Sequence, residues 1–334
     1  MCAVEFFATH GRLTVRYLFQ LGARYAAAVF IAWMMAFALW PWLQLGNPFR
    51  QFKVALTHFA TIPMTYEFSH WGERIWTSEL PATYIPGQLL ARLPEAFLLL
   101  LVVACIYALS AGVALAGTGW RATMLTVARR RAIFIVGVAV ILPIGFLIMQ
   151  RATLYDGIRH VLFVIPMLAI LAGFGFWALL PLLRRAPVIA AIGVGTYVGS
   201  VVGALAALHP LEYVAMNALA GGTRGAYGNF ELDYWSAAAT EGLRRLEHRL
   251  DYDPAVRTAD SPPSILICIP WREQLIDPML RRPWIVETDP EHADFIIATE
   301  RSRCADNQRV VLIDEVKRFD RTFAWVYARS GNDR

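Results

Sequence analysis

Five long apolar runs constrain the fold of this chain more than any other feature of its sequence. They cover residues 25–45, 97–116, 132–149, 161–183 and 188–208, and none has a charged residue in its interior. A helix needs about 20 consecutive apolar residues to cross the hydrocarbon core of a bilayer. Only 17% of all residues are charged, against about 25% in a soluble domain. We therefore predict an α-helical integral membrane protein with about five transmembrane helices.

The arginines predict the orientation of these helices. The first run is preceded by Arg12, Arg16 and Arg24. The second and third runs are separated by Arg121, Arg129, Arg130 and Arg131, and the fourth and fifth by Arg184 and Arg185. If the runs alternate, these segments share one face, which the positive-inside rule makes cytoplasmic. We expect a cytoplasmic segment 1–24, a bundle 25–208 and an extracytoplasmic domain 209–334. This placement of charge does not favour nucleic-acid binding, and the uncharged interiors do not favour a transporter.

Residues 46–96, between the first two runs, do not read as a simple loop. Asn47 and Pro48 suit the N-cap and first position of a helix. Apolar residues then recur at helical spacing, as Phe49, Phe52, Leu56 and Phe59. Basic residues lie between them, as Arg50, Lys53 and His58. We expect an amphipathic helix at the outer membrane surface.

The C-terminal part, 209–334, is predicted to be a small α/β domain. Helical periodicity runs from Trp235 to Leu250, and a second helix is expected near Glu273–Arg281. Short β-rich runs follow the linkers, with a hairpin last; they are Ser264–Ile269, Trp284–Glu287, Asp294–Ala298, Val310–Lys317 and Thr322–Arg329. Cys268 and Cys304 could pair in an oxidising compartment or remain two thiols. No Cys/His cluster has the spacing of a metal site.

Three segments carry a resemblance to a known family. The first runs Leu154-Tyr155-Asp156-Gly157-Ile158-Arg159-His160. The second runs from His209-Pro210-Leu211-Glu212-Tyr213 through Asn217 to Phe230-Glu231-Leu232-Asp233-Tyr234-Trp235, and the third from Tyr84 to Pro94. Together they resemble the C-terminal half of bacterial family 39 membrane glycosyltransferases, C-type enzymes related to protein mannosyltransferases and to the aminoarabinose transferase of lipid A. The resemblance extends from about residue 25 to the end.

The resemblance implies a polyprenyl-phosphate-linked sugar donor, a bacterial inner-membrane location and a site at the outer face. Enzymes of this family carry an acidic catalytic motif in their first external loop, and this chain shows no counterpart. Its first apolar run corresponds to a mid-protein helix. We therefore expect a truncated enzyme, or one half of a split enzyme that works with a separate N-terminal half. The alternative is a non-catalytic membrane protein whose external domain binds a partner.

The resemblance also assigns candidate site residues in the first and third segments. Arg159 would hold the lipid phosphate by charge-assisted hydrogen bonds, or it is an interfacial arginine that reaches lipid headgroups. His160 could bind substrate, or cap and pack. Tyr155 and Tyr84 belong to the same substrate-binding set. Asp156 could position an acceptor hydroxyl or act as a base; otherwise it is a turn residue or an ion-pair partner of Arg159.

The remaining candidates lie in the second segment. In an extended chain Glu231 and Asp233 would share one face. They could bind a divalent cation, although no further ligands are evident and we expect no cofactor; a structural role, with Asp233 capping the next helix, is the other interpretation. Tyr213 and Asn217, four residues apart on a helix, could bind substrate or join the soluble domain to the membrane part.

Overall fold

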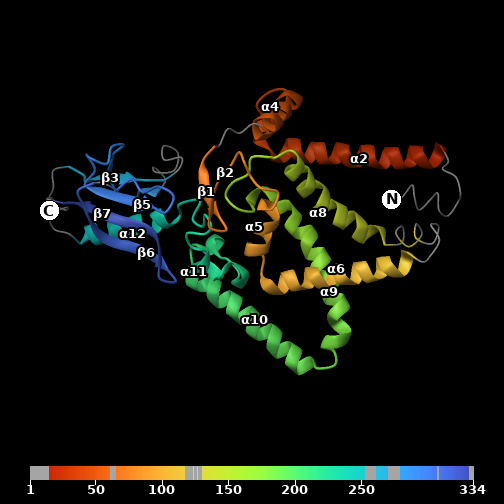
Figure 1. Cartoon of the computed structure of the whole chain (residues 1–334). Coiled ribbons are helices and arrows are strands. Elements are labelled where there is room, and N and C mark those ends of the chain that lie inside the picture. Colours follow the sequence, from red (N-terminus) through yellow and green to blue (C-terminus); the bar gives the residue numbers. More distant parts are fainter. Residues whose placement is uncertain are drawn as a thin grey trace. The chain divides into compact units, whose positions relative to one another are not determined.

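The computed structural model describes residues 15–60, 65–116, 123, 126, 130–252, 261–269, 279–306 and 308–330. The chain divides into two compact units. Figure 1 labels most of the helices and strands named below. The first unit contains residues 1–67, 76–86 and 96–185, and the second contains residues 68–75, 87–95 and 186–334.

Helices dominate the first unit. They are α2 (Val15–Leu39), α3 (Pro41–Gln44), α4 (Pro48–Ala60), α6 (Glu95–Ala116), α8 (Arg131–Met149), the 3₁₀ helix η1 (Arg159–Val164) and α9 (Ile165–Leu183). A short hairpin, β1 (Glu67–His70) and β2 (Glu73–Trp76), and helix α5 (Tyr84–Arg92) cross from one unit to the other.

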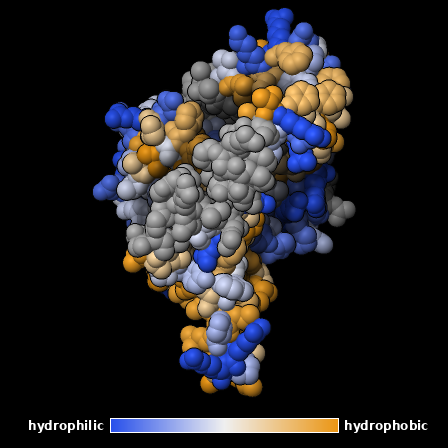
Figure 2. Space-filling model, turned by 90° about the vertical axis from the view of Figure 1, so that its right-hand side faces the viewer, coloured by the Kyte–Doolittle hydropathy of each residue, from blue (hydrophilic) through white to orange (hydrophobic). Residues whose placement is uncertain are grey.

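Five helical stretches in the described part of the chain are long and apolar enough to cross a membrane. They are Val15–Leu39, Glu95–Ala114, Arg131–Met149, Arg159–Leu183 and Pro187–Leu208. Their large apolar side chains are mostly exposed, and hydrophobic residues cover extended areas of the visible surface (Figure 2). Soluble proteins rarely expose such large contiguous apolar areas. The predicted number of apolar helices is therefore confirmed.

The first of these helices differs from the expected run 25–45. It begins at Val15 and ends at Leu39, because Trp40 adopts an extended conformation before Pro41, which starts the separate helix α3. Proline disfavours helical backbone in the residue that precedes it. Arg16 and Arg24 consequently lie within α2, which reaches further towards the N-terminus than the apolar run 25–45.

The helix expected after Asn47 is present as α4. The side-chain oxygen of Asn47 accepts the backbone N–H groups of Phe49 and Arg50, each over 3.1 Å. The ring of Phe49 stacks on Trp33 of α2 with centroids 4.9 Å apart. The sequence thus identified both the helix and its N-cap correctly.

Helices α6 and α9 approach each other closely at one point. A Cβ atom at Gly175 would overlap the carbonyl of Leu100 and lie 3.2 Å from the backbone nitrogen of Ala104. Small residues at such positions let the backbones of membrane helices come into contact. Gly175 therefore permits the crossing of these two helices.

The second unit contains α10 (Pro187–Leu208), the turns η2 (Glu212–Val214) and η3 (Ala218–Ala220), and the helices α11 (Gly222–Ala226) and α12 (Ala238–Asp251). Its sheet has the order β4-β3-β5-β7-β6. The strands are β3 (Ser264–Ile267), β4 (Ile285–Val286), β5 (Phe295–Thr299), β6 (Val310–Arg318) and β7 (Arg321–Arg329). β3 pairs parallel with β4 and β5, whereas β7 pairs antiparallel with β5 and β6.

The C-terminal α/β region confirms the expected strands and the helix after Trp235. Helix α12 packs its leucines against the sheet, where Leu243 and Leu246 meet Ile267, Ile297 and Val326. The last hairpin turns at Phe319 and Asp320, both with positive φ, as tight two-residue turns between twisted strands require. Most of the helix expected at Glu273–Arg281 lies outside the described residues.

Candidate functional site

A tight turn between α8 and α9 positions the first group of candidate residues. Asp156 and Gly157 both have positive φ, 57° and 72°, directly before η1 begins at Arg159. Glycine tolerates this conformation and aspartate adopts it more readily than most residues. The turn brings the Asp156 carboxylate to 2.9 Å from Nη1 of Arg159.

Aromatic and polar side chains surround this ion pair within the first unit. Tyr66 donates its hydroxyl to Oδ1 of Asp156 over 3.0 Å. The guanidinium carbon of Arg159 lies 4.4 Å from the centre of the Tyr155 ring. Nε of Arg159 donates to Nε2 of His160 over 3.3 Å, and the His160 ring packs edge-on against Tyr155. We call these five residues the Arg159 cluster.

Exposure differs within the Arg159 cluster. Asp156 is buried, whereas the Arg159 side chain keeps 24% of its surface accessible. A guanidinium has five N–H donors in a planar fork. Arg159 therefore combines a fixed carboxylate partner with partial exposure to the surroundings, an arrangement that suits an anionic ligand. Both the ion-pair and the turn interpretation of Asp156 agree with this geometry.

Two tyrosines outside the motif itself hold the turn. Tyr84 is fully buried, and its hydroxyl donates to the carbonyl of Gly157 over 3.4 Å. Tyr84 thus supports the turn rather than facing a ligand. Tyr66 was not predicted, because it lies 90 residues from Asp156 in sequence and carries no motif. Only folding brings Tyr66 to this carboxylate.

A second group of candidates lies in the second unit, around Asp233. Tyr213 donates its hydroxyl to Oδ1 of Asp233. The same carboxylate accepts the backbone N–H groups of Ala237 (2.9 Å) and Ala238 (3.2 Å) at the start of α12, as expected of a capping residue. Burial raises the pKa of Asp233 to about 6, and burial together with Asp233 raises the pKa of Tyr213.

Tyr213 and Asn217 do not share a helix, contrary to the expectation. Tyr213 lies in η2 and Asn217 precedes η3, with Ala215 extended between them. The amide of Asn217 donates to the carbonyls of Leu90 (2.5 Å) and Leu93 (2.7 Å), while its oxygen accepts from Ala220. Asn217 thus joins the end of α5 to η3, a structural role.

Glu231 contacts basic residues that the sequence did not single out. Its carboxylate lies 3.3 Å from Nε of Arg301, and its backbone carbonyl accepts from Arg92. Burial, with the nearby carboxylates of Asp233 and Glu231, raises the pKa of Glu300 to about 7. Across the described ranges, no three His, Cys, Asp or Glu residues are arranged to hold a metal ion.

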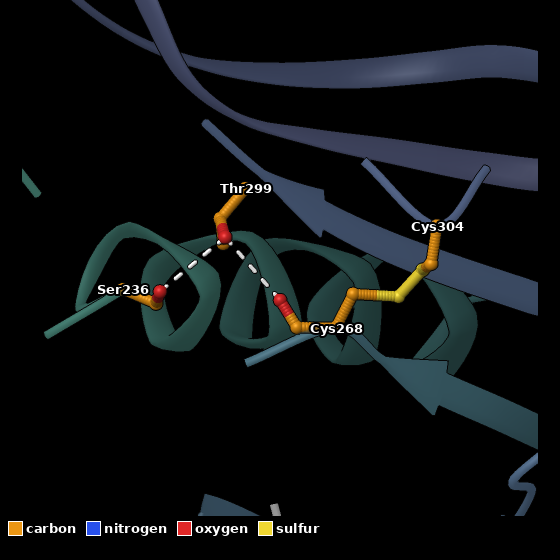
Figure 3. Close-up of a disulfide and its surroundings, with 4 residues drawn as sticks. All are labelled: Ser236, Cys268, Thr299 and Cys304. Atoms are coloured by element: carbon orange, nitrogen blue, oxygen red, sulfur yellow. Dashed lines mark hydrogen bonds between the residues drawn. A yellow bond between two sulfur atoms is a disulfide. The ribbon is translucent and has the colours of Figure 1, made fainter. Parts of the chain in front are cut away.

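The two cysteines of the α/β region form a disulfide. Cys268 follows β3 and Cys304 follows β5, with Cα atoms 6.1 Å apart. Figure 3 shows Thr299 beside this bridge, donating to the carbonyl of Cys268 over 3.2 Å and lying 3.3 Å from the hydroxyl of Ser236. The bridge therefore fastens the loop that carries Arg301 to the neighbouring parallel strand.

Comparison with known proteins identifies no relative of this chain. Neither a protein-family model, nor a curated protein, nor a solved structure matches it.

Proposed function

We propose that the chain takes part in transferring a sugar from a polyprenyl-phosphate donor to an acceptor outside the cytoplasm, and that the Arg159 cluster binds the donor phosphate. The observation that carries the proposal is the pairing of Arg159 with buried Asp156 at the first turn of an apolar, membrane-length helix. A lipid phosphate would sit at this depth, where the apolar helix begins.

The chemistry of the cluster suits a phosphate. Guanidinium groups bind phosphate oxygens through paired, charge-assisted hydrogen bonds, and they are less strongly hydrated than ammonium groups. Tyr155 covers one face of the Arg159 guanidinium, which fixes its plane. Oδ1 of Asp156 is held by Tyr66 and Oδ2 by Arg159, so Asp156 positions the guanidinium in this proposal rather than moving a proton.

The proposed orientation places the C-terminal α/β region outside the cytoplasm, in the inner membrane of a bacterium. The disulfide between Cys268 and Cys304 supports it, because disulfides persist in oxidising compartments and are rare in the cytosol. The arginines at the start of α8 and at the end of α9 support it through the positive-inside rule.

Binding of farnesyl phosphate to the purified full chain in detergent tests the proposal. We expect wild-type protein to bind farnesyl phosphate, and uncharged farnesol much more weakly. Arg159→Ala should weaken binding at least about tenfold, since a charge-assisted bond contributes about 1.5–3 kcal/mol. Arg159→Lys should recover part of the lost affinity for farnesyl phosphate. Arg151→Ala, which removes an exposed arginine from the same loop, is the control. Unchanged binding in Arg159→Ala would refute the assignment.

A second candidate function is a non-catalytic membrane protein whose α/β region binds a partner. The engagement of Asn217 and Asp233 in the fold favours it, because neither side chain is left to act on a substrate. Failure of the wild-type chain to bind farnesyl phosphate, even with a candidate N-terminal half co-expressed, would select this candidate.

A further inference from the structure

A small pocket lies between α6 and α9, towards the C-terminal end of α9. Its volume is about 240 Å³, and it is lined by Tyr107, Trp177, Ala178, Leu180, Pro181 and Arg184. The rings of Tyr107 and Trp177 meet edge to face with centroids 5.9 Å apart. The two helices come closest at Gly175, where an added Cβ would overlap the carbonyl of Leu100. The pocket therefore has apolar, aromatic walls and one cationic residue.

Positive charge gathers at this end of α9, and no acidic residue pairs with it in the described part of the chain. Arg184 is the C-cap of α9 and Arg185 follows it, both exposed. No ion pair found among the described residues involves either arginine. The sequence contains no Asp or Glu between Asp156 and Glu212. Two neighbouring positive charges thus remain for a ligand.

Apolar surface borders these arginines. Trp177 and Leu182 are more than half exposed on α9. In Figure 2, hydrophilic atoms gather at the bottom of the view, at the connection that follows α9, next to hydrophobic surface. A free phosphate ion would make no use of the aromatic walls. A molecule that joins an anionic head to hydrocarbon chains matches both features.

We propose that Arg184 and Arg185 bind the phosphodiester of an anionic phospholipid, and that one acyl chain covers the Tyr107–Trp177 pocket. Basic residues beside membrane helices attract anionic headgroups in this way. The site lies at the opposite end of α9 from Arg159, and it does not depend on the proposed function. The ligand class is a phospholipid such as phosphatidylglycerol, rather than an uncharged or zwitterionic lipid.

Native mass spectrometry of the detergent-purified full chain tests this site with equal amounts of phosphatidylglycerol and phosphatidylcholine. Wild-type protein should retain phosphatidylglycerol preferentially. The double variant Arg184→Ala/Arg185→Ala should lose about twenty-fivefold in this preference, at about fivefold per arginine. The matched control Arg281→Ala/Arg282→Ala removes two adjacent arginines, one of them beside Trp284, and should behave as wild type.

Two further variants keep the proposal testable if the double alanine variant folds poorly. Arg184→Lys/Arg185→Lys preserves the charge and should retain the preference. Trp177→Ala preserves both arginines and should weaken retention of phosphatidylglycerol several-fold. The proposal is overturned if the alanine double variant retains phosphatidylglycerol as wild type does, if Trp177→Ala has no effect, or if millimolar inorganic phosphate displaces the lipid.

Discussion

Arg318, at the end of β6, donates its Nε–H to the carbonyl oxygen of Leu208, the last residue of α10, over 3.2 Å. Its Nη2 group donates to the carbonyl of His209 and to Oε2 of Glu241, each over 2.6 Å. One side chain therefore satisfies the C-terminal carbonyls of a membrane-length helix and joins it to the hairpin and to α12. The positive charge also complements the helix dipole.

Arg318→Ala is expected to loosen this junction. Loss of hydrogen bonds to a charged group costs about 1.5–3 kcal/mol, so the thermal midpoint of the purified protein should fall and proteolysis after α10 should accelerate. Arg224→Ala is the control. Its pairing with Asp320 is long, 3.9 Å, and exposed, so its effect should stay within about 0.5 kcal/mol. Equal effects of the two variants would contradict the assigned role of Arg318.

Removing the disulfide is expected to destabilise the α/β region by about 3–4 kcal/mol. The bridge joins residues 36 positions apart in sequence. Without it the unfolded chain gains conformational entropy, and this gain sets the size of the destabilisation. Chemical unfolding of Cys268→Ser/Cys304→Ser against wild type measures it. In wild-type protein, maleimide should reach these two cysteines only after reduction and unfolding. Labelling before reduction would show that the thiols are unpaired.

Gly175→Ala is expected to disturb the crossing of α6 and α9. The added Cβ would overlap the Leu100 carbonyl, and overpacking of this kind costs about 1–3 kcal/mol. Gly173 lies on the same helix with open space around its Cβ position. Gly173→Ala should be neutral or stabilising by up to about 1 kcal/mol, from helix propensity. Thermal unfolding in detergent compares the two, and a harmless Gly175→Ala would argue against the close approach.

The stability of the second unit should depend on pH through Glu300. Its folded pKa, about 7, lies above its ordinary value of 4.5, so the folded state holds more protons between these values. This contribution is complete below about pH 4.5 and is lost as the pH rises through 7. Glu300→Gln should flatten the fall in thermal midpoint across this window. Exposed Glu291→Gln is the control and should retain the wild-type slope.

His70 should make stability depend on pH in the opposite direction from Glu300, since burial lowers the pKa of His70 to about 4. A histidine kept neutral by the fold loses stability as the pH falls from about 6.5 through 4. His70→Gln should therefore remove part of the acid sensitivity while leaving the Glu300 slope in place. A steeper loss of stability at acidic pH in His70→Gln would contradict this assignment.

Single cysteines test the proposed orientation. In a background without Cys2 and Cys105, an impermeant maleimide should label Tyr252→Cys in sealed cells and Ala186→Cys only after permeabilisation. Both positions are exposed, so access to the label depends on the side of the membrane. The opposite labelling pattern would invert the topology and remove the support for a lipid-linked sugar donor.

Features that depend on local composition could be predicted from the amino-acid sequence. Long apolar runs predict membrane-length helices because an apolar helix satisfies its own backbone in lipid, and alternating patterns predicted the strands of the α/β region. Asn47 predicted the start of α4, because its side-chain oxygen can accept the first backbone N–H groups of a helix. The end of α2 at Leu39 was not predicted, because the apolar run continues past Pro41 to residue 45.

Contacts between distant segments became known only from the folded structure. Nothing in the sequence relates Tyr66 to Asp156 or Arg318 to Leu208, because hydrogen bonds between residues about 100 positions apart leave no local pattern. The same holds for the choice between a disulfide and two thiols at Cys268 and Cys304, which depends on two strands lying side by side. Sequence periodicity records which face of an element is apolar, whereas folding determines which partner that face meets.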